Sequence, residues 1–64
     1  MRVLYGGDNE KVGWVESIDE LVQIFSDNDV EVREIHDLIM NLLDNGHHLG
    51  QHGNGRYFAV VEPK

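Results

Sequence analysis

Three histidines close together in the C-terminal part of the chain are the residues best suited to chemistry. His47, His48 and His52 follow Asp44. Imidazole and carboxylate groups are typical ligands of zinc and nickel, so a metal site at His47, His48 and His52 is one hypothesis. The segment is rich in glycine, and adjacent side chains of an extended chain point in opposite directions. The alternative is a polar loop, or a partner contact whose charge depends on pH.

Other signatures of catalysis are missing from the sequence. The chain has no cysteine, and its two serines, Ser17 and Ser26, occupy expected helix-capping positions. The pairs Gly6-Gly7 and Gly53-x-Gly55 lack the lysine and the following helix of a phosphate-binding loop. Carboxylates on an exposed helix also lack the enclosed pocket that separates the pKa values of an acid and a base. We therefore expect a protein that is not an enzyme and uses no cofactor.

Carboxylates dominate the middle of the chain. The formal net charge is −7, from 12 acidic and 5 basic residues. Between residues 16 and 37 the one basic residue is Arg33. The acids of this segment are Glu16, Asp19, Glu20, Asp27, Asp29, Glu31, Glu34 and Asp37. Such a field repels nucleic acid and anionic membranes and attracts basic protein surfaces.

Two amphipathic helices are expected to carry these acids. Ser17 and Glu20 form a capping box that begins the first helix. Its apolar residues recur at helical spacing: Ile18, Leu21, Val22 and Phe25. After a break at residues 26–29, a second helix is predicted from about residue 30 to residue 44, ending at Asn45-Gly46 with Gly46 left-handed. Its apolar positions are Val32, Ile35, Leu38, Ile39, Leu42 and Leu43.

Strands are predicted on both sides of the helical region. Residues 1–5 and 12–16 should form a hairpin with residues 6–11 as its connection. Residues 49–51 suggest a short strand, residues 52–55 a turn, and residues 56–62 a final strand that Pro63 ends. The predicted fold is a single α+β domain over residues 1–64, in the order β-β-α-α-(β)-β. It is a small antiparallel sheet of three to four strands with two helices packed on one face.

Helices on one face leave the other face of the sheet uncovered. If Phe58 and Val60 point toward the helices, then Tyr57, Ala59 and Val61 point away and form an apolar stripe. Tyrosine and tryptophan are favoured in interfaces, which makes Trp14 and Tyr57 candidate partner contacts. A homodimer through this aromatic face would also compensate for the small core of so short a chain.

The acidic helical face supports the leading functional hypothesis. The protein would dock this face on a basic protein surface, including one that normally binds nucleic acid, and so act as an inhibitor or regulator. The candidate contacts are Asp27, Glu31, Glu34 and Asp37, with Trp14 and Tyr57 on the sheet. Short acidic proteins of this kind are often encoded by phages or mobile elements. This expectation is based on the size and charge of the chain.

Direct binding to nucleic acid or membranes is not expected. The basic residues are scattered along the chain: Arg2, Lys11, Arg33, Arg56 and Lys64. The start of the chain lacks the apolar run of a signal peptide, and no apolar run approaches the length that spans a bilayer. We expect a complete, soluble, cytoplasmic gene product.

Overall fold

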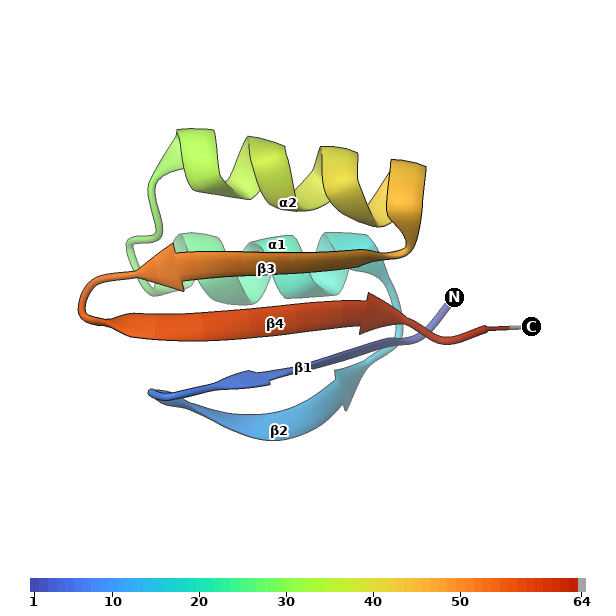
Figure 1. Ribbon diagram of the computed structural model, residues 1–64, viewed down its shortest axis with the longest axis horizontal. Coiled ribbons are helices and arrows are strands. Elements are labelled where there is room, and N and C mark those ends of the chain that lie inside the picture. Colours follow the sequence, from blue (N-terminus) through green and yellow to red (C-terminus); the bar gives the residue numbers. More distant parts are fainter. Residues whose placement is uncertain (64) are drawn as a thin grey trace.

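The computed structural model describes residues 1–63 and has six elements of secondary structure (Figure 1). They are β1 (Val3–Gly7), β2 (Glu10–Val15), α1 (Ile18–Asp27), α2 (Val32–Asn45), β3 (His47–His52) and β4 (Gly55–Val61). The predicted α+β class and element order are confirmed. The strand predicted at residues 49–51 is a full fourth strand that begins directly after Gly46, which is left-handed with a φ of 78° as predicted.

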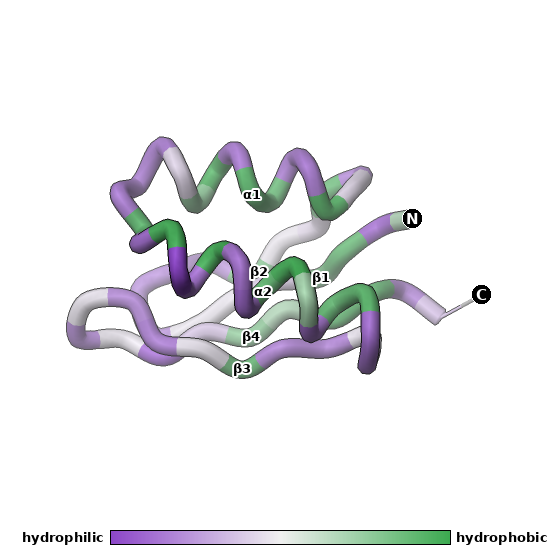
Figure 2. Tube along the Cα trace, turned by 90° about the horizontal axis from the view of Figure 1, so that it is seen from above, coloured by the Kyte–Doolittle hydropathy of each residue, from purple (hydrophilic) through white to green (hydrophobic). Residues whose placement is uncertain are grey.

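The sheet is antiparallel throughout, in the order β2-β1-β4-β3. The first and last strands of the chain are therefore the central pair, while β2 and β3 lie at the edges. Both helices lie on one side of this sheet, as the two perpendicular views show (Figures 1 and 2). The other face, called here the open face, carries no layer formed by residues 1–63.

The first hairpin is tighter than predicted. Its strands extend through Gly6-Gly7 and Glu10-Lys11, so the loop is Asp8-Asn9 instead of residues 6–11. Glycine permits this because a Cβ at Gly7 would overlap the carbonyl oxygen of Arg56 on β4. Asp8 fastens the loop to β4: its N–H donates to Arg56 O at 2.9 Å, and its Oδ2 accepts from the Arg56 N–H at 3.1 Å.

The helix boundaries follow from capping chemistry. The Ser17 hydroxyl accepts a hydrogen bond from the Glu20 N–H at 3.1 Å, and Glu20 Oε2 accepts one from the Glu16 N–H at 2.9 Å. Ser26 does not cap, because it lies within α1. The turn between the helices places Asp29 at a φ of 61°, so α2 starts at Val32, slightly later than predicted.

The core lies between the helices and the inner face of the sheet. Tyr57 and Phe25 meet edge to face at 4.9 Å between ring centroids, and Tyr5 also packs edge to face with Phe25 at 6.5 Å. Around these rings lie the buried residues Val3, Val15, Leu21, Val30, Ile35, Leu38, Leu42 and Ala59. Neither helix within residues 1–63 is long and apolar enough to cross a bilayer.

Two expectations about facing were wrong. Tyr57 and Ala59 point toward the helices, whereas Val60 is exposed on the open face, the reverse of the predicted arrangement. On α2, Val32 and Leu43 are 84% and 63% exposed instead of belonging to the core. The reason is that the buried stripe of α2 is narrow, formed by Ile35, Leu38 and Leu42, and these two residues lie beside it on a flank of the helix.

The capping contact predicts a measurable effect on stability. Replacing Ser17 with alanine removes the acceptor for the Glu20 N–H and should lower the free energy of unfolding by about 1 kcal/mol in urea denaturation. Ser26→Ala is the matched control, because Ser26 is an exposed residue within the same helix. Its effect should stay within about 0.5 kcal/mol. Equal effects of the two substitutions would contradict the capping assignment.

Candidate functional site

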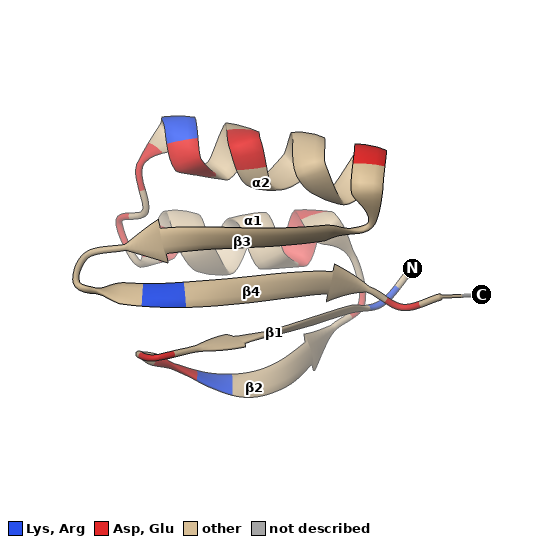
Figure 3. Cartoon of the chain, viewed as in Figure 1, with Lys and Arg blue, Asp and Glu red and all other residues tan. Residues whose placement is uncertain are grey.

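Acidic residues lie along the two helices and the turn between them (Figure 3), and those that are exposed form the acidic layer. Its members are Asp19, Glu20, Asp27, Asp29, Glu31, Asp37 and Asp44. Of the predicted contacts, Asp27 ends α1 and accepts a hydrogen bond from Gln23 Nε2 at 3.0 Å. Glu31 is the N-cap residue of α2 but makes no side-chain capping bond. Asp37 is exposed on α2.

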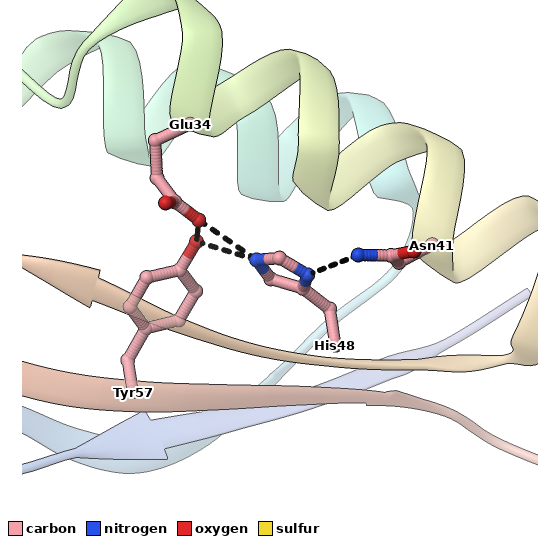
Figure 4. A network of polar contacts seen from close by, with 4 residues as sticks. All are labelled: Glu34, Asn41, His48 and Tyr57. Atoms are coloured by element: carbon pink, nitrogen blue, oxygen red, sulfur yellow. Dashed lines mark hydrogen bonds and ion pairs between the residues drawn. The ribbon is translucent and has the colours of Figure 1, made fainter.

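Glu34 does not belong to the acidic layer, contrary to the prediction. Its side chain is 23% exposed and turns from α2 toward the sheet (Figure 4). Glu34 Oε2 accepts a hydrogen bond from the Tyr57 hydroxyl at 2.5 Å and lies 2.8 Å from His48 Nε2. The folded structure therefore accounts for this acid, which the sequence had suggested was free for a partner.

A polar clamp joins α2 to β3 and β4. It consists of Glu34 and Asn41 from α2, His48 from β3 and Tyr57 from β4 (Figure 4). Asn41 Nδ2 lies 2.8 Å from His48 Nδ1, and His48 is only 5% exposed. Because the Asn41 amide nitrogen can only donate, Nδ1 accepts and Nε2 carries the imidazole proton. The Nε2–H then donates to Glu34 Oε2, with the Tyr57 oxygen 3.1 Å away.

The clamp changes the ionisation of its phenol. Burial raises the pKa of Tyr57, and the hydrogen bond to Glu34 together with the negative charges of Glu34 and Asp37 raises it further. The neutral phenol is therefore stabilised as a hydrogen-bond donor. Both ring nitrogens of His48 and the Tyr57 hydroxyl are therefore engaged within the clamp.

Gly50 provides the space in which the clamp closes. A Cβ at this position would lie 2.7 Å from ring atoms of Tyr57 and would also meet the Glu34 carboxylate. Asn41 and Gly50 were not predicted from the sequence to belong to a site. The spacing of Glu34 and Asn41 in the sequence could have indicated the clamp. These two residues lie four and three residues from Leu38, which places both polar residues beside the buried stripe of α2.

The three predicted metal ligands do not form one cluster. His47 and His48 point to opposite faces of β3, and His48 is engaged by the clamp. His52 lies at the other end of β3, where it lines a hollow of about 260 Å³ with Glu31 and Glu34. Within residues 1–63 no three histidine, aspartate or glutamate side chains are placed to share a metal ion.

The open face presents apolar side chains that the helices leave uncovered. Strand register places Leu4 between Trp14 and Val60, and Phe58 beside Leu49. Trp14 is 48% exposed and Leu49 is 80% exposed. Tyr57, the other predicted aromatic contact, lies on the buried face instead. The open face is defined by Leu4, Val12, Trp14, Leu49, Phe58 and Val60.

Two arginines border the open face. The Arg2 guanidinium lies 4.2 Å from the centre of the Trp14 ring, and its Nε is 3.8 Å from Glu62 Oε2. Arg56 lines a hollow of about 500 Å³ together with Leu49 and Phe58. The molecule thus has an acidic helical layer and, on the opposite side, an apolar face bordered by Arg56 and by Arg2, which is paired with Glu62.

Comparison with protein-family models, characterised proteins and solved structures found no match to this chain.

The clamp predicts a specific loss of stability when its phenol is removed. Tyr57→Phe deletes the donor to Glu34 and should lower the free energy of unfolding by about 1.5–3 kcal/mol, the range for hydrogen bonds to charged groups. Tyr5→Phe is the matched control. Tyr5 also packs against Phe25, but its hydroxyl has no hydrogen-bond partner within residues 1–63. That variant should change stability by less than about 0.5 kcal/mol.

The same pair of variants tests the raised pKa of Tyr57. An unfolded chain loses the phenolic proton near pH 10, whereas the folded protein retains it. The stabilisation is therefore fully present below about pH 10 and is lost as the pH rises further. Urea denaturation at pH 8 to 11 should show an alkaline decline that Tyr57→Phe reduces and Tyr5→Phe retains. An identical decline in both variants would contradict this assignment.

Proposed function

We propose that the protein is a small, cytoplasmic, non-enzymatic binding protein that docks its acidic layer on a basic surface of another protein. The observation that carries this proposal is the exposure of Asp27, Glu31 and Asp37. Within residues 1–63 none of these three carboxylates forms an ion pair. Their charges thus remain available to an incoming surface, whereas Glu34 is engaged inside the fold.

One class of expected partner is a protein that normally binds nucleic acid. Asp27 at the end of α1, Glu31 at the start of α2 and Asp37 within α2 present separate exposed negative charges, which suits a groove lined with lysine and arginine. The positive potential that steers nucleic acid into such a groove would also attract the acidic layer. Occupying the groove would inhibit or regulate the partner. Size and charge also fit a modulator encoded by a phage or a mobile element.

The acidic layer can be tested by removing charge without disturbing the fold. A triple variant, Asp27→Asn, Glu31→Gln and Asp37→Asn, should reduce capture of the partner from lysate by at least tenfold, about 1.4 kcal/mol or more. Capture by the unmodified protein should weaken as salt is raised, because the interaction is electrostatic. Competing duplex DNA should reduce it when the partner is a nucleic-acid-binding protein.

A second triple variant serves as the control, because it removes the same charge elsewhere. Glu10→Gln, Glu16→Gln and Glu62→Gln lie outside the two helices. This variant should retain capture within about threefold. If the two triple variants behave alike, net charge alone is responsible and the docking surface is misassigned.

The uncovered sheet supports a second candidate function, a protein-interaction module that binds through its open face. The specific observation is the apolar surface around Trp14, bordered by Arg2 and Arg56. Charge complementarity favours a partner protein with an apolar centre and an acidic rim. Tryptophan and arginine are also the residues most often found at interface hot spots.

Charge placed on the open face distinguishes the two candidates. In the same capture assay, Val12→Lys should reduce binding by at least about tenfold if the open face is the contact surface. Val32→Lys is the control, because Val32 is also an exposed valine, at 84% against 68% for Val12, and lies on α2. The emission of the single tryptophan, Trp14, should shift to shorter wavelength when the captured partner is added back. Unchanged emission and full capture by Val12→Lys would eliminate this candidate.

A further inference from the structure

The two edges of the sheet differ in how well they are protected against pairing with another strand. Edge β2 carries Glu10 and Lys11, and its pairing with β1 contains a register shift. Charged side chains and bulges are the usual means of blocking an edge. Edge β3 has neither, because its sequence is His-His-Leu-Gly-Gln-His and its pairing with β4 is regular from His47 to His52. β3 is therefore the sheet edge that is open to a further strand.

Ladder geometry shows which backbone groups of β3 are available. His52 and Gly55 close a two-residue loop, so they exchange hydrogen bonds, and every second residue of β3 does the same with β4. The hydrogen bond from Val61 N–H to Gly46 O, at 2.8 Å, fits this alternation. The N–H and C=O groups of His47, Leu49 and Gln51 therefore point outward. Within residues 1–63 no backbone hydrogen bond from a turn, loop or cap occupies them.

Charge limits what can approach this edge. Residues 45–61, which include the whole β3–β4 hairpin, contain no carboxylate, although the protein carries a net charge of −7. Two copies of the chain can thus meet at this hairpin with less repulsion than at the acidic layer. Acids from α2 and its N-cap lie beside this edge: Glu34 contacts His48, and Glu31 and Glu34 line a hollow with His52. Asp37 and Asp44 flank the face that Glu34 and Asn41 turn toward β3. Arg33 lies on the same flank and partly offsets them.

We propose that a second copy of the chain pairs with β3 in antiparallel orientation, with a two-fold axis at Leu49. This register places His47 opposite Gln51 of the partner subunit. All three outward-facing residues of each copy then form hydrogen bonds between the chains, whereas fewer do so if the register is shifted by two residues. The proposed register forms about six inter-chain hydrogen bonds. Both helical layers lie on the same side of the joined sheet, and the two open faces become one continuous apolar surface across Leu49.

This pairing is independent of the acidic-layer proposal and differs from the sheet-face homodimer predicted from the sequence. It uses an edge and leaves the open face uncovered. It also responds to salt in the opposite way. Two copies of charge −7 repel each other, so added salt should strengthen the dimer, whereas it should weaken docking of the acidic layer on a basic partner.

Sedimentation of the purified protein at about 1 µM to 1 mM is the first test, since a contact of one strand pair is small. We expect a monomer–dimer equilibrium that salt shifts toward dimer. Leu49→Pro should weaken the dimer roughly tenfold or more, because proline lacks the outward-pointing N–H of residue 49. The hydrogen bonds between β3 and β4 are retained. Leu49→Thr retains that N–H and should weaken the dimer less. Val12→Lys, on the opposite edge, should leave it unchanged.

Cysteine cross-linking tests the register without disturbing the backbone, because the chain has no cysteine of its own. Across the proposed axis the two Leu49 Cα atoms are roughly 5.5 Å apart, within the range of a disulfide. The two Gln51 Cα atoms are displaced by roughly 13 Å along the strand. Mild oxidation should therefore join Leu49→Cys into a covalent dimer and leave Gln51→Cys largely monomeric.

Three outcomes would overturn the proposal. They are a strict monomer at 1 mM in high salt, equal cross-linking of Leu49→Cys and Gln51→Cys, or a dimer that Val12→Lys abolishes. A monomer whose β3 amides become protected against hydrogen exchange only when an extended peptide is added would assign the edge to a foreign strand instead of a second copy.

Discussion

The carboxylate of Glu34 constrains the rest of the structure, because it is held between a helix and the sheet. A largely buried carboxylate needs hydrogen-bond donors, and here they come from Tyr57 on β4 and His48 on β3. Their geometry sets the height and rotation of α2 over the sheet. Asn41 then fixes the orientation of the imidazole about two turns farther along the helix. Gly50 must lack a side chain, because the phenol ring and the carboxylate occupy that space.

This constraint also separates the acids that serve the fold from those that do not. Glu20 completes a capping arrangement, Asp8 fastens the first hairpin to β4, and Glu34 holds the clamp. Asp27, Glu31 and Asp37 have no comparable role within residues 1–63. These three carboxylates lie on the helical layer, and the open face of the sheet lies opposite. The molecule therefore has two surfaces of different chemistry, one acidic and one apolar. Each surface therefore suits a different kind of contact.

Sequence reasoning succeeded where local chemistry decides the structure and failed where tertiary contacts do. The Ser17 cap and the left-handed Gly46 follow from the residues themselves, as does the periodicity of the helices. The facing of β4 could not be decided in this way, because Phe58, Ala59 and Val60 are apolar and their neighbours give no alternation. Glu34 looked like its exposed neighbours, since only the arrival of β3 and β4 supplies its donors. The loop at Asp8 also depended on a distant contact, namely Arg56.

The order of strands affects how the molecule can fold. The two central strands, β1 and β4, lie at opposite ends of the sequence of elements, and the core residues Val3 and Ala59 come from them. A growing chain that has formed β1, β2 and both helices still lacks the strand that joins the two halves of the sheet. Pairing β4 with β1 closes a loop that contains all the other elements. This closure is entropically unfavourable until the core residues of both strands can pack together. We therefore expect the first hairpin and the helices to remain only transiently ordered until β4 inserts between β1 and β3, which makes folding a single late and cooperative event.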